Sequence, residues 1–250
     1  LSNKKQLLET IYLSSEFSYE QEIDLIDSLI NINKVKLLLL DLLDVENGFS
    51  YLDLLVRINI PICVISDDSY YHEFPVNLVI NGNPNQLEEN YIKFKDNYLI
   101  GPKYFIMDKS YSTIQRKYNN KSNVLVSLGV TDHNDIIFVV LKSLIKSNYV
   151  EKIVVISSKS SGYSSKLENL AIENKDTEIE IHLDVESLFF YWQTCGLAIT
   201  AGGNTLFERI ASGIPGATVC QLQRQMEIAS SFENLKVNVN LGFGPTLSEK

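Results

Sequence analysis

ITAGGNTLFERIASGIP, at residues 199–215, contains the signals of a strand, a sharp turn and a helix in direct succession. The apolar strand ends at Thr200. Gly202 and Gly203 follow, so the backbone can turn there without interference from a Cβ atom. A helix is expected over residues 204–211, because a Gly-Ile-Pro sequence ends it. This order of elements is typical of one βα unit in a parallel sheet.

The start of this helix is the main candidate binding site. Asn204 and Thr205 are residue types that begin helices, and the free N–H groups of a first helical turn suit a phosphate group. Gly202 and Gly203 let the backbone approach such a ligand closely. Glu208 lies one turn further along, where a carboxylate can accept both hydroxyls of a ribose. The alternative is an ordinary βα turn with a surface glutamate.

Two further loops offer contacts to the same ligand. The sequence SLGVTD, at residues 127–132, also follows an apolar run and precedes a helix, so Gly129 and Thr131 are candidates for the pyrophosphate. Arg224 and Gln225 open the helix after the last predicted strand, where Arg224 suits a phosphate and Gln225 a sugar. An ordinary βα turn and a solvated helix face are the respective alternatives.

The second half of the chain repeats this pattern. Short apolar runs alternate with helical patterns, which predicts five βα units, enough for a complete doubly wound domain. Strands are expected at residues 124–128, 152–157, 178–182, 197–200 and 215–220, with helices at 135–147, 164–174, 186–193, 204–211 and 223–235.

The first half carries fewer signals of the same kind. A run that is apolar except at Lys36 predicts a buried strand at residues 35–40. Further strands are expected at residues 61–66 and 78–80, with a helix at 51–58. Both ends of the chain look like cuts from a longer protein. The expected domains are a partial N-terminal lobe at residues 1–107, whose first βα unit precedes Leu1, a linker or hinge at 108–122, and a nucleotide-binding lobe at 123–250.

Composition and charge exclude several classes of function. The chain has 250 residues, a formal charge of −9 and a pI of about 4.9, and so acidic a chain repels the phosphate backbones of nucleic acids. Cys63, Cys195 and Cys220 lack metal-ligand spacing, and we interpret them as buried hydrophobes of a protein in the reducing cytoplasm. No apolar run reaches the roughly 20 residues that a membrane-spanning helix needs. Neither a metal nor a cofactor is predicted.

Catalytic groups are marked less clearly. The three histidines have no metal-binding spacing, although His182 ends a strand and His133 adjoins the loop at residues 127–132. An ordinary surface or packing role is the alternative for these histidines and for His72. Aspartates at strand ends are better candidates, because ligands of open sheets bind at the carboxyl ends of strands. These aspartates, for which strand-end capping is the alternative, are Asp41, Asp44, Asp67 and Asp68.

Several segments together resemble a known family. LLLLDLLD, VISDD, LVINGN, LIGPKYFIM and VLVSLGVTD precede AITAGGNTLFERIASGIP in this order. The set, over residues 35–242, resembles the GT-B type glycosyltransferases. Among them it is most similar to the family of the UDP-sugar hydrolase of pseudaminic acid biosynthesis and the spore-coat polysaccharide biosynthesis protein G. The resemblance implies an α/β fold with two Rossmann-like, doubly wound parallel-sheet lobes facing a cleft.

The resemblance also implies a UDP-sugar as the ligand and assigns positions to its parts. Residues 202–205 would face the pyrophosphate and Glu208 the uridine ribose. Gly129 would border the phosphates, Leu183 would lie near the base, and Gln225 would contact the sugar. Neither the catalytic residue nor the oligomeric state is predicted.

Differences from the family concern the activity. The family's hydrolases keep an essential histidine in a GxGHxxR loop after their first strand, and this sequence lacks that loop. Val130 stands where the family usually has a glycine, and Arg224 where it often has an asparagine. The resemblance therefore implies a UDP-amino-sugar hydrolase, or a fragment of one, that removes UDP from a diacetamido-trideoxy sugar, with residues 1–250 inactive alone. A GT-B glycosyltransferase using a UDP-sugar donor and a noncatalytic nucleotide-sugar-binding module are the alternatives.

Overall fold

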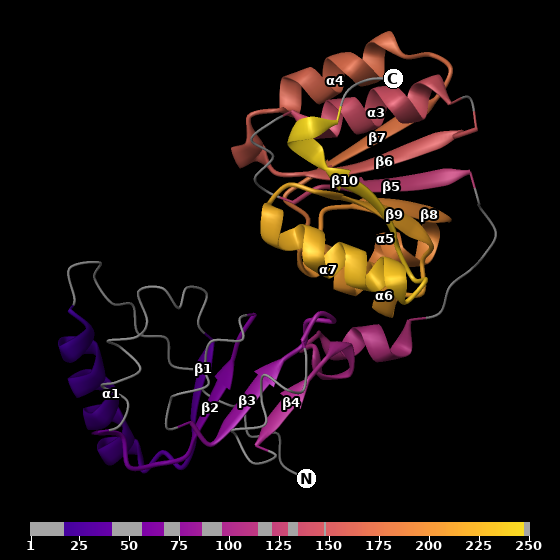
Figure 1. Cartoon of the computed structure of the whole chain (residues 1–250). Coiled ribbons are helices and arrows are strands. Elements are labelled where there is room, and N and C mark those ends of the chain that lie inside the picture. Colours follow the sequence, from indigo (N-terminus) through magenta and orange to yellow (C-terminus); the bar gives the residue numbers. More distant parts are fainter. Residues whose placement is uncertain are drawn as a thin grey trace. The chain divides into compact units, whose positions relative to one another are not determined.

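The computed structural model of the chain describes residues 18–41, 57–67, 76–86, 97–114, 122–129, 135–147 and 149–247. The chain divides into two compact units, Leu1–Tyr104 and Phe105–Lys250. Each unit contains one parallel β-sheet with helical segments (Figure 1). The expected fold class, two α/β lobes built on parallel sheets, is therefore confirmed.

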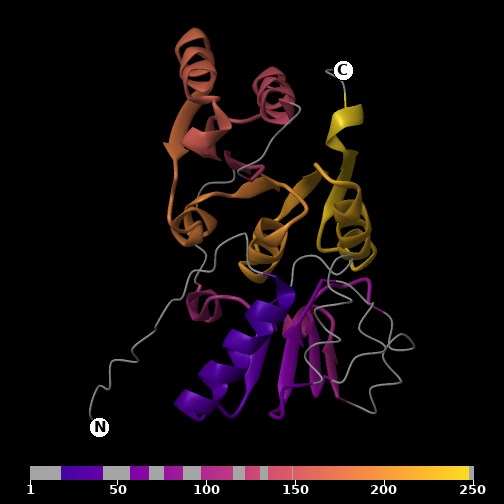
Figure 2. The same cartoon turned by 90° about the vertical axis from the view of Figure 1, so that its left-hand side faces the viewer.

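The first unit has four parallel strands that pair in chain order. They are β1 (Leu38–Asp41), β2 (Ile62–Ile65), β3 (Leu78–Asn81) and β4 (Tyr98–Ile100). Helix α1 (Tyr19–Asn33) begins after Ser18, which forms a capping box with Gln21. Figure 2 shows α1 against one face of this sheet, where Ile23 and Ile30 pack on apolar strand residues.

The second unit is a six-stranded parallel sheet covered on both faces. Its strands are β5 (Asn123–Ser127), β6 (Lys152–Ser157), β7 (Glu178–Leu183), β8 (Leu197–Thr200), β9 (Gly216–Cys220) and β10 (Val239–Phe243). Its helices are α3 (Ile136–Lys146), α4 (Ser164–Glu173), α5 (Phe189–Thr194), α6 (Asn204–Ala211) and α7 (Gln223–Asn234). In Figure 1, α3 and α4 lie on one face and α5, α6 and α7 on the other.

The strand order of this sheet reverses beside β5. The order is β10-β9-β8-β5-β6-β7, so the chain runs outward from β5 to β7, returns to β8 on the other side of β5, and continues to β10. Pairing of β5 with β8 ends at Ser127 and Thr200, so both strands end at the same level. Ligands of open α/β sheets bind at the carboxyl ends of strands where the order reverses.

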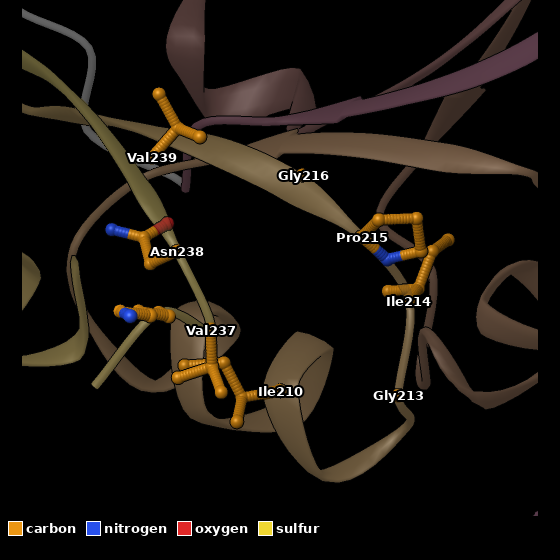
Figure 3. A pocket seen from close by; sticks show the side chains of 9 residues that line it. Ile210, Gly213, Ile214, Pro215, Gly216, Val237, Asn238 and Val239 are labelled. Atoms are coloured by element: carbon orange, nitrogen blue, oxygen red, sulfur yellow. The ribbon is translucent and has the colours of Figure 1, made fainter. Parts of the chain in front are cut away.

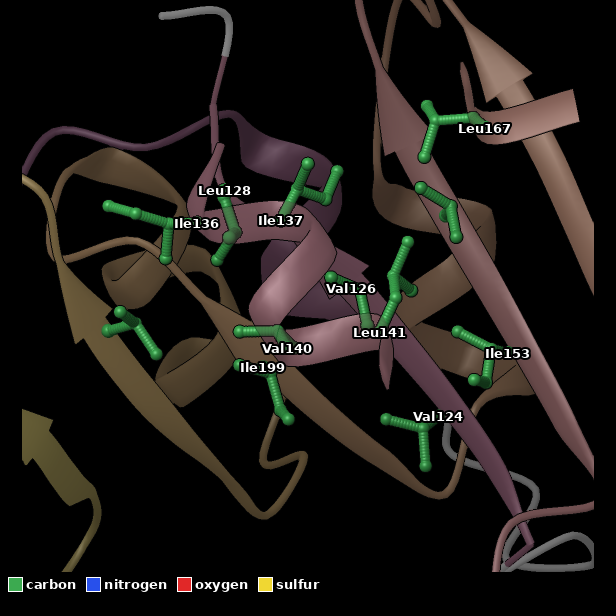
Figure 4. Packing of buried hydrophobic residues seen from close by; sticks show 12 residues of the cluster. Val124, Val126, Leu128, Ile136, Ile137, Val140, Leu141, Ile153, Leu167 and Ile199 are labelled. Atoms are coloured by element: carbon green, nitrogen blue, oxygen red, sulfur yellow. The ribbon is translucent and has the colours of Figure 1, made fainter. Parts of the chain in front are cut away.

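The core of the second unit follows from strands that are apolar on both faces. Val124 and Val126 of β5 pack on one face with Ile137 and Leu141 of α3 (Figure 4). Leu125 points to the opposite face and joins a separate cluster with α5. Successive side chains of a strand alternate between the two faces, so a continuous apolar run fits a sheet with helices on both sides.

The predicted elements of the second unit are confirmed to within a few residues at their ends. Helix α5 begins at Phe189, three residues later than expected. The prediction missed β10, because Asn240 and Gly242 interrupt its apolar residues. In the first unit it missed β4, which has only three residues and follows a polar segment.

One buried strand was predicted wrongly. Residues 35–40 were expected to be apolar on two buried faces, but β1 covers only Leu38–Asp41 and alternates in burial. Leu39 is 57% exposed and Leu40 is 8% exposed. The run of leucines therefore reflects one buried face, since β1 lies at the edge of the described sheet.

Several other predictions fall outside the described residues or stay predictions. Thr131, Asp44, Asp68, His72, His133 and most of the helix at residues 51–58 lie outside them. The domain limits stay a proposal. A 3₁₀ helix, η6 (Lys109–Thr113), occupies the start of the expected linker and belongs to the second unit. Within the described ranges, no helix is long and apolar enough to cross a membrane.

Close approach of β9 to β8 gives a test of this sheet. A Cβ atom at Gly216 would overlap the carbonyl oxygen of Ala198 and lie 3.1 Å from Cδ of Arg209. We expect Gly216→Ala to lower the free energy of unfolding by about 1–3 kcal/mol, measured by urea denaturation. Ser165→Ala, on an exposed helical position, is the control. An unchanged midpoint for Gly216→Ala would contradict the close pairing of these two strands.

Candidate functional site

The loops after β5, β8 and β9 are joined by hydrogen bonds at the carboxyl edge of the six-stranded sheet. The backbone N–H of Ala201 donates to Ser127 O at 3.2 Å, which ties the loop after β8 to the end of β5. Nε2 of Gln221, after β9, donates to Leu128 O at 2.6 Å. The candidate residues of three separate loops therefore lie around the point where the strand order reverses.

The first turn of α6 presents its N–H groups without a side-chain cap. Gly203 is the N-cap residue, and among the residues that the structure describes no side chain accepts from the first turn. The first turn contains no acidic residue, Asn204 is exposed and Thr205 is partly exposed. Unpaired N–H groups and the positive end of the helix dipole together attract an anion.

Gln225 brings the start of α7 against this turn. Its Oε1 accepts from the backbone N–H groups of Gln221 at 2.8 Å and Leu222 at 3.3 Å, so the loop before α7 engages its carbonyl side. A Cβ atom at Gly203 would lie 3.7 Å from Nε2 of Gln225. Nε2 of this amide, which has no acceptor among the described residues, therefore lies beside the first turn of α6.

Glu208 is held by a residue that the sequence analysis did not consider. The hydroxyl of Tyr111, on η6, donates to Oε2 of Glu208 at 2.7 Å. The same hydroxyl accepts from Nε1 of Trp192 at 3.1 Å. Tyr111 precedes Glu208 by 97 positions, and no local pattern connects two residues so far apart.

Thr200 is a second residue that the sequence analysis did not single out. It ends β8 and is fully buried, and its Oγ1 has no hydrogen-bond partner in the described part of the chain. Buried hydroxyls are nearly always paired, so an unpaired one beside the reversal point is unusual. The signal available from the sequence was a polar residue at a strand end immediately before a glycine turn.

The remaining candidates lie at different distances from this turn. Gly129 follows β5 directly, is exposed and has φ +86°, a conformation that favours glycine. Arg224 is exposed at the second position of α7. Leu183 ends β7, three strands away from β8, which corresponds to roughly 14 Å along the sheet edge. The structure thus groups the loop residues and places Leu183 apart.

Two of the candidate catalytic residues, His182 and Asp67, have structural partners. Nε2 of His182 lies 2.5 Å from Oε1 of Glu180, and its ring centroid lies 5.0 Å from that of Tyr191. In the first unit, Nδ2 of Asn83 donates to the backbone carbonyl of Asp67 at 3.0 Å and to the carboxylate Oδ1 of Asp67 at 3.5 Å. Among the described residues, no cluster of histidine, cysteine and carboxylate side chains could hold a metal ion.

The cysteines are buried and free, as expected. Burial raises the pKa of Cys195 and of Cys220 to about 11. Cys63 is also buried, and its pKa is raised for the same reason. These thiols stay protonated near neutral pH, which makes them unsuited to act as nucleophiles.

Arg209, in the last turn of α6, is a buried cation without a carboxylate partner among the described residues. It donates from Nη1 to Ile214 O at 3.3 Å and from Nη2 to Oδ1 of Asn238 at 2.6 Å. Burial lowers its pKa to about 10, so the guanidinium stays charged near neutral pH. Its two hydrogen-bond acceptors are neutral, so they do not cancel this charge.

In the described part of the chain, two pockets lie away from the candidate site. One, of about 360 Å³, lies where β9 and β10 begin and is lined by residues such as Ile210, Pro215 and Asn238 (Figure 3). The other, of about 480 Å³, lies between α3 and α4. The first is at the amino edge of the sheet, opposite the edge that carries the glycine turn.

No protein-family model matches the chain. Two curated proteins are similar in sequence. An uncharacterized protein of Methanocaldococcus jannaschii is 27% identical over 147 residues, which cover 56% of this chain and 30% of that protein. The spore coat polysaccharide biosynthesis protein SpsG of Bacillus subtilis is 26% identical over 179 residues, which cover 69% of this chain and 52% of SpsG. The chain thus spans about half the length of SpsG and less of the archaeal protein.

Solved structures agree on the fold. The glycotransferase of kitacinnamycin superposes with a TM-score of 0.62 at 13% identity, covering 92% of this chain and 69% of that one. The Staphylococcus aureus MnaA–UDP complex gives 0.61 at 14% identity, covering 94% and 69%. The chain has a GT-B-like fold and resembles SpsG. The family resemblance inferred from the ordered segments is confirmed at this level.

Gly202 and Gly203 allow a matched test of the turn. A Cβ atom at Gly202 would lie 2.7 Å from Cβ of Gln225, whereas at Gly203 the nearest atom is 3.7 Å away. We expect Gly202→Ala to lower the melting temperature by several degrees, because the start of α7 must shift. Gly203→Ala, with extended backbone at φ −92°, should leave it nearly unchanged. Calorimetry that ranks the two variants in the reverse order would contradict this packing.

Proposed function

We propose that the chain binds a UDP-sugar at the carboxyl edge of the six-stranded sheet. The diphosphate would lie on the first turn of α6, beside the backbone of Gly203 and Nε2 of Gln225. The observation that carries this proposal is the meeting of an uncapped helix N-terminus with a free amide donor where the strand order reverses. Gly129, after β5, and Arg224 border the same space in the proposal.

Glu208 fits the ribose better than the diphosphate. A carboxylate beside a diphosphate would be repelled, whereas the two hydroxyls of a ribose are donors for it. Tyr111 occupies Oε2, and Oε1 has no partner in the described structure, so one oxygen is available. In this arrangement the base would extend along the sheet edge toward Leu183. The MnaA structure was solved with UDP, which supports the choice of nucleotide.

We propose further that the whole protein acts in surface or spore-coat polysaccharide biosynthesis, as SpsG is named for. The reaction would be hydrolysis of a UDP-amino sugar, in which the helix N-terminus stabilises the departing UDP. The second candidate is glycosyl transfer with the same leaving group, favoured by the likeness of fold to a glycotransferase. Product analysis separates the two: hydrolysis releases a free sugar and transfer does not.

The ribose role of Glu208 predicts a ligand-dependent loss. Glu208→Ala should weaken UDP binding by about 1–3 kcal/mol, because charge-assisted hydrogen bonds to the ribose are lost. Pyrophosphate binding should change far less. Isothermal titration calorimetry measures both, with Glu168→Ala, exposed on α4, as the control for the loss of one negative charge. Equal losses for the two ligands would refute the ribose role.

The diphosphate role of Gln225 predicts an effect of charge. Gln225→Glu keeps an oxygen for the backbone N–H groups of the loop but replaces the free donor by negative charge. We expect UDP affinity to fall at least about tenfold and the melting temperature to change little. Gln223→Glu makes the same charge change at an exposed position of α7. Gln223→Glu should bind UDP as the unmodified chain does. If Gln225→Glu also binds UDP this tightly, the diphosphate does not lie beside Gln225.

A further inference from the structure

The segment that opens the second unit is anchored on α6. The ring of Phe105 stacks on Phe207 with centroids 3.9 Å apart and planes 8° from parallel. Further along, Oδ1 of Asp108 caps η6 by accepting from the backbone N–H of Ser110 at 2.7 Å. These contacts, from residues that precede Tyr111, support the backbone that carries it. Its side chain therefore approaches α6 from a supported position.

Both hydrogen-bonding functions of the Tyr111 hydroxyl are used. Trp192, which is fully buried, donates its indole N–H to this oxygen, and the hydroxyl donates its own hydrogen to Glu208. Burial and the neighbouring carboxylate raise the pKa of Tyr111, so the phenol stays protonated. The direction of the bond to Glu208 is therefore fixed, with the carboxylate as acceptor.

This arrangement restricts a side chain that would otherwise be mobile. A glutamate on a helix surface samples several rotamers, and holding it in one costs entropy when a ligand binds. Tyr111 holds Oε2 at 2.7 Å before any ligand is present, which leaves Oε1 in one place. An oxygen that is already in position binds a ribose hydroxyl at a smaller entropic cost.

We propose that Tyr111 is a positioning residue that orients Glu208 toward the ribose of the bound nucleotide. This inference rests on the proposed function, because it requires that Glu208 contact the ribose. Its consequence is selectivity: Tyr111 favours nucleoside diphosphates over ligands that have the same phosphate groups but no ribose. Trp192, in turn, orients Tyr111.

The substitution Tyr111→Phe removes one oxygen atom and tests this role. Calorimetry should show UDP affinity falling about tenfold, with pyrophosphate affinity unchanged. In a Glu208→Ala background the same substitution should cause no further loss of UDP affinity, because the coupled pair is already broken. Tyr149→Phe, at a residue that is 89% exposed, is the matched control. Equal losses of affinity for UDP and pyrophosphate would overturn the positioning role. So would a Tyr111→Phe loss of UDP affinity that is as large in the Glu208→Ala background as in the unmodified chain.

A second measurement needs no variant. Trp192 is the one tryptophan of the chain, so its indole N–H gives a single resonance in a ¹⁵N-correlated spectrum. Ribose binding to Glu208 should shift this resonance through Tyr111, whereas pyrophosphate should leave it in place. A resonance unmoved by saturating UDP would overturn the inference.

These outcomes separate the two proposals. A chain that does not bind UDP would refute the proposed function and this inference together. UDP binding that depends on Glu208 but not on Tyr111 would overturn the positioning role alone.

Discussion

Parallel pairing of β5 with β8 is the constraint on which the candidate site depends. The two strands end together at Ser127 and Thr200, yet they lead to helices on opposite faces of the sheet. Because the chain leaves β5 and β8 toward opposite faces, the two following helices diverge from this edge. Only loops lie where the two strands end. The glycine turn, the first turn of α6 and Gly129 all lie at this edge because of the strand order.

An acidic chain can carry an anion site when the site relies on backbone groups. The formal charge is −9, but the first turn of α6 contains no acidic side chain and its N–H groups are uncapped. Arg209, in the last turn of the same helix, hydrogen-bonds only neutral acceptors among the described residues, and these acceptors belong to residues that line the pocket at the opposite edge of the sheet. The dipoles of such backbone groups act at short range, whereas solvent and salt screen the distant net charge.

Most strands of the second unit could be predicted because each is a continuous apolar run, which a sheet covered on both faces requires. The same rule failed for β1, whose leucines have one exposed face, and it missed β10, where polar and glycine residues interrupt the run. Edge strands bury only part of their surface, so their sequences carry a weaker pattern. Whether the second face of a strand is buried depends on elements that are distant in the sequence, and a short stretch of residues does not reveal them.

The sequence by itself determined the local features of this protein: the strand that ends at Thr200, the glycine turn, the start of a helix at Asn204 and the carboxylate one turn along it. Only the tertiary structure decided which groups meet there. It placed Nε2 of Gln225 beside Gly203 and the hydroxyl of Tyr111 on Glu208. Turns and helix starts depend on neighbouring residues, whereas a hydrogen bond across 97 positions depends on the path of the whole chain.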